Sequence, residues 1–277
     1  MTLAAWASGY IPTTEDLELA DRSLVDTLAA AIAGRDEPTV RRGASLTEPG
    51  MWAVAAHVLD FDDLHMESTT HISAVCVPAA LAVGGDARAY LAGAGVMARL
   101  GVALGWLHYT SGWHATCTSG APAAAVAAGV AMGLDSRQLA TAITLAVPGA
   151  GGVRRAFGTD AKSLQVGFAV ETGIRAATLA AAGATADLAT LDQWMPLVGG
   201  DPQQVGVDGP AVPGGLAIKL YPCCCAMQRP IGSLVESRGG IDVEAIEKIV
   251  VRTPRGTVTP LIHHDPVTGL EGKFSLE

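Results

Sequence analysis

Long stretches of alanine and glycine without a charged side chain constrain this chain more than any other feature of its sequence. The run from Gly120 to Leu134 is one example, and it is shorter than the ~20 strongly apolar residues that span a bilayer. Apolar residues make up 49% of the chain and charged residues only 16%, so many helices must be buried on more than one face. We therefore predict a thick helical core, no membrane span and self-association, most simply as a homodimer.

Helical periodicity predicts one large all-helical unit. A cap at Thr13 or Thr14 opens a helix in which Leu17, Leu24, Leu28 and Ile32 recur near helical spacing until Gly34. Similar patterns predict further helices over Pro49–Leu59, Ile72–Val83, Ala87–Trp106, Ala121–Met132, Ser136–Leu145 and Ser163–Ala182. Up to about Gly200 no alternation typical of a strand occurs, so this part of the chain reads as all-α.

A second unit is expected after a connection rich in proline and glycine over residues 199–215. It should hold a helix near Gln228–Ser237 and a strand near Ile246–Thr253, where Ile249 and Val251 alternate with other positions. The sequence ends without a further element to close this unit. We thus predict a mainly α protein, with a large all-helical domain over residues 1–215 and a smaller, truncated α+β domain over residues 216–277.

Charge and cysteine usage exclude several function classes. The net charge is -9, and no cluster of Lys and Arg is longer than two residues, so nucleic acid is not an expected partner. The five cysteines lack the Cys-x-x-Cys spacing of zinc or redox sites. Ala161 before Lys162 excludes a P-loop, and Gly149–Gly152 follows a helix where a dinucleotide fold needs a strand. The opening residues do not resemble a signal peptide, so a cytoplasmic location is expected.

Acidic and imidazole side chains gather in one stretch, at His57, Asp60, Asp62, Asp63, His65 and His71. On a helix His57 and Asp60 would share a face, and a carboxylate beside an imidazole fixes its tautomer for acid/base work. A metal site is the rival interpretation, although no His-x-x-x-His pair supports it. In the third interpretation the aspartates simply end a helix, and His65 and His71 are ordinary loop residues. Spacing alone leaves these alternatives open.

His114 and two lysines stand at joints between predicted elements. His114 lies in a polar loop, Ser111–Thr118, between two apolar helices, and a neutral imidazole facing a cleft there suits general base catalysis. Lysine occurs at only four positions, of which Lys162 precedes a helix and Lys219 opens the second unit. A lysine at such a joint suits an anionic substrate, whereas a solvated surface lysine is the simpler interpretation.

Five short segments, taken in order, resemble the MmgE/PrpD family. They are Ala56–Asp63, His71–Ser73, Gly112–Thr116, Gly158–Lys162 and Lys219–Pro222, and Thr268–Leu276 is similar to a segment late in the family's lid domain. The resemblance covers nearly the whole chain, which is shortened near residues 34–42 and at its C-terminus relative to the family. It implies a homodimeric enzyme with a large helical domain, a smaller α+β lid and a cleft between them.

The resemblance also implies active-site positions for Asp60, His71, His114, Lys162 and Lys219. We expect His114 to act as base or acid, Asp60 and His71 to orient groups or relay protons, and the lysines to hold substrate carboxylates. The expected activity is that of a metal-independent hydro-lyase like 2-methylcitrate dehydratase, without a cofactor, on a small di- or tricarboxylate. Decarboxylation and epimerisation share its proton-abstraction step. The alternative is an inactive shortened relative that binds carboxylates or serves as a subunit partner.

Overall fold

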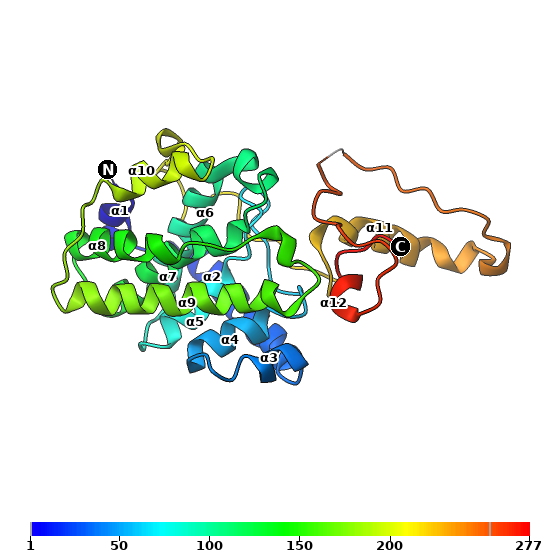
Figure 1. Ribbon diagram of the computed structural model, residues 1–277, viewed down its shortest axis with the longest axis horizontal. Helices are drawn as coiled ribbons and strands as arrows, with labels where there is room; N and C mark the ends of the chain where they lie inside the picture. Colours follow the sequence, from blue (N-terminus) through cyan, green and yellow to red (C-terminus); the bar gives the residue numbers. More distant parts are fainter. Residues whose placement is uncertain (1, 255) are drawn as a thin grey trace.

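A computed structural model describes residues 2–254 and 256–277 and is mainly helical. Within these described residues, ten α-helices precede residue 216 and two follow it (Figure 1). Their bounds are α1 Leu3–Gly9, α2 Thr14–Gly34, α3 Pro38–Arg42, α4 Glu48–His57, α5 Ser73–Leu81, α6 Ala87–Thr110, α7 Ala115–Ala131, α8 Ser136–Ala146, α9 Asp160–Ala181, α10 Thr190–Leu197, α11 Cys225–Ser237 and α12 Gly269–Gly272. The prediction of a large helical unit is confirmed.

Helix α7 forms the centre of the helical part, and its residues from Ala115 to Val130 are all buried. It packs against α5, α6, α8 and α9. Close approach requires small residues: a Cβ atom added at Gly173 of α9 would lie 2.4 Å from the Cβ of Ala124, and one at Gly93 of α6 would lie 2.7 Å from that of Ala127. The Ala/Gly-rich stretches therefore let four helices surround a fifth at short range.

The start of α2 and the burial of α6 both follow from their local sequences. Thr13 accepts a hydrogen bond from the Asp16 amide and Asp16 reciprocates, which makes a capping box at the start of α2. Helix α6 meets the length and composition of a membrane span, but 78% of its most apolar window is buried inside the domain. Helix α6 is therefore a mostly buried core helix.

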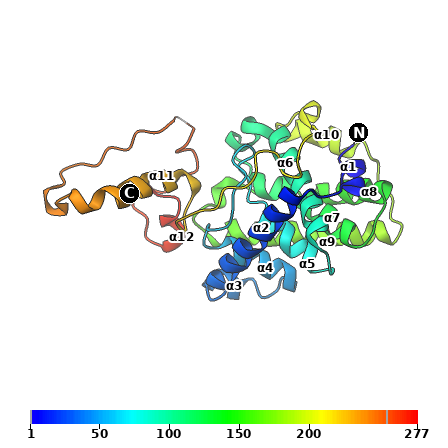
Figure 2. The ribbon, with the colours of Figure 1, turned by 180° about the vertical axis from the view of Figure 1, so that it is seen from behind.

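Residues 216–277 lie to one side of the helical part, where α11 and α12 are joined by a long chain (Figures 1 and 2). The predicted helix in this part is confirmed as α11, but the strand expected over Ile246–Thr253 is wrong for this structure. Within the described residues of 216–277 no strand ladder forms, and Ile246, Ile249 and Val250 are exposed. A strand needs a partner for its backbone groups, and this segment meets none.

A small apolar cluster connects the two parts. Phe157 of the helical part packs with Cys223, Cys224, Met227 and Phe274 of the other part. The isolated bridge between Leu64 and Ala217 adds a second connection. The division at residue 216 remains a prediction, but these contacts show where the functional groups of both parts meet.

Candidate functional site

Asp60 is the centre of a buried cluster of charged side chains. Helix α4 ends at His57, and Asp60 then adopts a left-handed backbone conformation with φ of 53°, which L-residues with a side chain rarely adopt and which is frequent at functional sites. Its Oδ1 atom lies 3.1 Å from the Nζ atoms of both Lys162 and Lys219, and Lys219 also donates to its carbonyl oxygen at 2.7 Å. One carboxylate thus holds two lysines.

Each of these lysines comes from a different part of the molecule. Lys162 lies in the first turn of α9, whose start is tied to α3 by the hydrogen bond from Thr39 to Asp160 and by the ion pair of Arg42 with Asp160 at 2.7 Å. Lys219 lies in the chain that leads to α11. Both are 5% exposed, which overturns the interpretation of either as a solvated surface lysine.

Three imidazoles surround the same cluster. Nδ1 of His57 bonds Asp62 Oδ2 at 2.7 Å, and Nδ1 of His71 lies 3.1 Å from that oxygen. Nε2 of His57 is 2.5 Å from Lys162 Nζ, and Nε2 of His71 is 3.4 Å from Asp60 Oδ1. Because the lysine ammonium group can only donate, His57 must carry its proton on Nδ1 and accept at Nε2.

His114 completes the cluster as the residue that precedes α7. Its ring lies 5.9 Å from that of His57 and packs edge-on against Phe157 at 5.0 Å. Its Nδ1 atom is 3.2 Å from Cys117 Sγ and 3.3 Å from Gln165 Oε1. His114 is only 2% exposed, so it is not a solvent-exposed loop histidine.

Burial and charge set the protonation of the cluster. Burial lowers the pKa of His57 to about 4, and burial and the Lys162 charge hold the pKa of His114 well below its usual range. Burial alone would raise the pKa of Asp60, but Lys162 and Lys219 outweigh it and lower that pKa. Likewise Asp60 outweighs burial and raises the pKa of Lys219. At neutral pH the result is an ionised Asp60 carboxylate, a charged Lys219 and neutral imidazoles at His57 and His114.

Two aromatic rings cover the lysine side of the cluster. Phe157 and Phe274 pack with ring centroids 4.9 Å apart, and Lys162 Nζ lies 5.4 Å from each centroid. The Phe157 carbonyl bonds the His263 ring, and the Phe274 carbonyl accepts from the His263 amide. The segment around Phe274 therefore shields the ammonium group from water, which strengthens its attraction to anions.

Four of these side chains could hold a metal ion by atom type. The candidate ligand atoms of His57, Asp60, Asp62 and His71 lie within 4.8 Å of one another. However, the ammonium groups of Lys162 and Lys219 already contact His57 and Asp60, and a second cation there would be repelled. The donor set therefore fits a divalent ion poorly, and metal independence remains a prediction.

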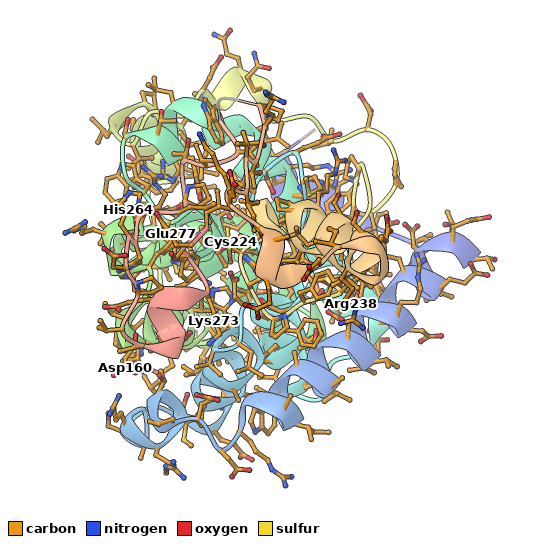
Figure 3. The ribbon with its side chains drawn as sticks, turned by 90° about the vertical axis from the view of Figure 1, so that its right-hand side faces the viewer. Asp160, Cys224, Arg238, His264, Lys273 and Glu277 are labelled. Atoms are coloured by element: carbon orange, nitrogen blue, oxygen red, sulfur yellow. The ribbon has the colours of Figure 1, made fainter. Side chains whose placement is uncertain are left out.

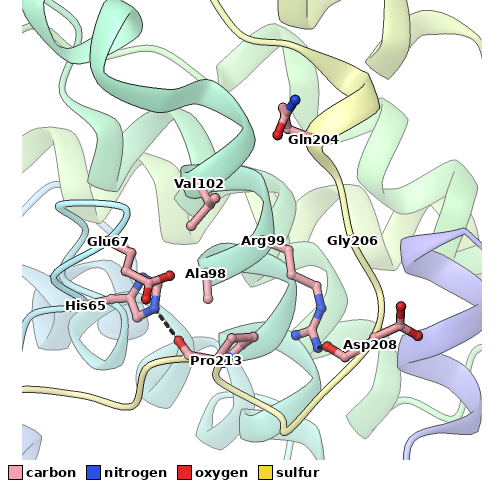
Figure 4. A pocket seen from close by; sticks show the side chains of 9 residues that line it. All are labelled: His65, Glu67, Ala98, Arg99, Val102, Gln204, Gly206, Asp208 and Pro213. Carbon is pink, nitrogen blue, oxygen red and sulfur yellow. Dashed lines mark hydrogen bonds between the residues drawn. The ribbon is translucent and has the colours of Figure 1, made fainter.

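All five predicted site residues lie in or beside this cluster: Asp60, His71, His114, Lys162 and Lys219. The expectation that His57 and Asp60 share a helix face is wrong, because the helix ends at His57 and the partner of His57 is Asp62. His65 lies outside the cluster and bonds Ser68 and the Pro213 carbonyl. It lines a separate pocket of about 160 Å³ with Arg99 (Figure 4).

Sequence reasoning missed the structural importance of several contacts. His57 and Asp62 were part of the noted cluster, but nothing in their spacing shows that Asp62 serves two imidazoles. Phe157 and Phe274 are far apart in the sequence and meet only through the fold. The position of Phe157, just before the Gly158–Lys162 segment, was the only sign in the sequence that an aromatic ring lies near the site.

Comparison with known proteins adds two kinds of similarity. Two cis-aconitate decarboxylases are similar to this chain: that of Aspergillus terreus (strain NIH 2624 / FGSC A1156) is 26% identical over 90% of this chain, and another from Aspergillus terreus is 25% identical over 85% of it. The matched regions cover 54% and 53% of those relatives, so the chain spans about half their length. The MmgE/PrpD N-terminal domain matches residues 51–196, which include four of the five site residues. Since this match covers more than half of the chain, the protein belongs to the MmgE/PrpD family.

Proposed function

We propose that this protein is a lyase that acts on a small tricarboxylate by proton transfer next to a carboxylate. The observation that carries the proposal is the convergence of two buried lysines on Asp60 beside three imidazoles. Buried cations attract carboxylates strongly because little water screens them. The names of the two similar proteins favour decarboxylation of a substrate like cis-aconitate, and dehydration like that of 2-methylcitrate is the second candidate.

The lysines act as the charge clamp. Asp60 contacts both ammonium groups through its Oδ1 atom, so one negative charge is shared between two positive charges. Substrate carboxylates compete with Asp60 for Lys162 and Lys219, and they bind where two cations already lie close together. In the transition state the same cations stabilise the negative charge that develops on the enolate-like carboxylate.

The imidazoles transfer protons. His114 is the leading base or acid, because its Nδ1 atom is engaged with Cys117 and Gln165 while the ring lies beside Phe157 and His57. In a decarboxylation the C–C bond breaks and CO₂ leaves, and the electron pair left on carbon takes a proton that His114 has first gained from water and then donates as an imidazolium. In a dehydration the same group removes a proton from carbon and passes it to the departing hydroxyl, which leaves as water. His71 and Asp60 orient the reacting groups or relay protons between them.

The alternative proposal is an inactive relative that binds carboxylates or serves as a subunit partner. It keeps the lysine clamp but needs no proton transfer. Assays with cis-aconitate, 2-methylcitrate and iminodisuccinate distinguish the two: release of CO₂ or formation of an unsaturated product supports the lyase, with the parent protein compared against His114→Ala. Saturable binding of all three compounds without turnover favours the alternative, and absence of both binding and turnover contradicts either.

The remaining proposals concern the state of the protein. A homodimer is proposed because an apolar stripe on α2 is exposed, at Leu17, Leu24, Val25, Leu28 and Ile32. Light scattering should give about twice 28.2 kDa.

We also propose a metal-independent, cytoplasmic enzyme without a cofactor, whose activity survives exhaustive chelation. Residues 216–277 are proposed as a lid domain over residues 1–215, and any α+β character of that lid belongs to this proposal.

A further inference from the structure

A third lysine, Lys273, is held at the edge of the cluster. Its carbonyl oxygen accepts a hydrogen bond from the Cys224 amide at 3.1 Å, and the next residue, Phe274, packs against Phe157 and lies beside Lys162. Figure 3 shows Lys273 and Cys224 on the same side of the molecule, beside α12. Backbone and ring contacts thus fix the chain on both sides of Lys273.

The ammonium group of Lys273 has no ion-pair partner among residues 2–254 and 256–277. Its contact is the Gly269 carbonyl at 3.5 Å, a distance too long for a strong hydrogen bond. Half-burial lowers its pKa, the nearby Lys162 charge lowers it further, and Glu37 and Asp60 oppose both effects. Lys273 is therefore an unpaired cation whose field reaches Asp60 and Lys162.

The neighbouring cation Arg154 differs from Lys273 in the contacts that its charged group makes. Arg154 donates to the Thr259 carbonyl at 3.1 Å and lies over the Tyr109 ring at 4.7 Å. Lys162 and Lys219 share Asp60. Among the described residues Lys273 and Arg154 make no ion pair, but only Lys273 has a single long contact to a carbonyl as its hydrogen bond and no aromatic ring beneath its charge.

Counting charges suggests what Lys273 binds. Lys162 and Lys219 lie beside the carboxylates of Asp60 and Asp62, and a tricarboxylate would bring three further negative charges. Two of its carboxylates can bind the lysine clamp, but the third needs another cation. We propose that Lys273 binds the third carboxylate and so makes the site selective for tricarboxylates over dicarboxylates. This inference rests on the proposed function, because it deepens the assignment of the substrate.

The test uses two ligands that differ in one group. Tricarballylate and glutarate have the same carbon chain between their terminal carboxylates, and only tricarballylate carries a carboxylate on the central carbon. Binding of each is measured by calorimetry to the parent protein, Lys273→Gln, Lys273→Arg and the control Lys248→Gln, whose lysine is exposed on the far segment. Thermal unfolding of each variant verifies that it is folded.

We expect Lys273→Gln to weaken tricarballylate binding about 10-fold or more and to leave glutarate binding within about twofold. Lys273→Arg should restore the preference, and Lys248→Gln should match the parent. An equal loss for both ligands, or no loss for either, overturns the role of Lys273 while the lysine clamp stands. If the parent protein binds neither ligand, the proposed function fails, and the role of Lys273 fails with it.

Discussion

The helical part and residues 216–277 pack in opposite ways. In α7 the residues from Ala115 to Val130 are all buried, whereas in α11 only Met227 is buried. The helical part supplies Asp60, His71, His114 and Lys162, while the weakly packed part supplies Lys219, Lys273 and Phe274. In the proposed function, the helical part (below, the wall) is a rigid support for the groups proposed to transfer protons. Residues 216–277 (below, the cover) are less stably packed and contribute Lys219 and Lys273.

The largest effect should come from the residue that joins the two parts. Asp60→Ala leaves two buried lysines without their carboxylate, and we expect a loss of about 3–5 kcal/mol in the free energy of unfolding, measured by urea titration. Asp265→Ala is a matched control, since Asp265 also has a positive φ of 51° but is exposed. It should cost roughly 1 kcal/mol or less. Similar losses for both variants would show that backbone strain, not charge pairing, governs Asp60.

Kinetic measurements should distinguish the role of His114 in the wall from that of Lys219 in the cover. His114→Ala should lower kcat about 100-fold with little change in substrate affinity, because a base acts on the chemical step. Lys219→Ala should weaken substrate binding by roughly 2–5 kcal/mol, because a substrate carboxylate and Asp60 each lose a partner.

Lys248→Ala is the control for both variants, because Lys248 is exposed and far along the cover. Its kcat and its calorimetric binding constant should equal those of the parent. If all three variants match the parent in turnover and binding, the assignment of the site is wrong despite the family membership.

The same contrast explains what could be read from the sequence. The helices were predictable because apolar and small residues recur with helical spacing, and the bounds of α2 and α8 agree with the prediction to within about a residue. The two rare lysines and the family resemblance identified site residues. Pairing of His57 with Asp62 was not predictable, because it depends on the positive φ of Asp60. The strand at Ile246–Thr253 was mispredicted, since a local alternation cannot show whether a partner strand exists.

The same substitution, glycine to alanine within a helix, tests the difference in packing between the two parts. Gly173→Ala would place a methyl group 2.4 Å from the Ala124 Cβ and 2.6 Å from the Ala125 amide nitrogen, so we expect a loss of about 1–3 kcal/mol in stability. Gly232→Ala in α11 meets only the Tyr221 hydroxyl at 3.9 Å. There alanine favours the helix, and stability should rise by roughly 0.5–1 kcal/mol. Chemical denaturation measures both, and equal losses would contradict the packing difference.

The last expected effect concerns pH and again contrasts the two parts. Burial lowers the pKa of His57 from 6.5 to about 4, so the unfolded chain binds a proton that the folded protein does not. The stabilising contribution is complete above pH ~6.5 and is lost as the pH falls toward ~4, which amounts to roughly 2 kcal/mol between pH ~6.5 and ~5. Urea titrations at several pH values should show this slope in the parent protein.

Two glutamine variants test whether His57 causes that slope. His57→Gln should reduce the slope by about one proton whatever its stability at neutral pH, because the variant has no imidazole to titrate at this position. His264 of the cover is exposed, and its hydrogen bond with Glu277 raises its pKa. Water and salt screen that contact, so His264→Gln should leave the slope unchanged. A slope that survives His57→Gln but disappears with His264→Gln would place the pH sensitivity in the cover instead of the wall.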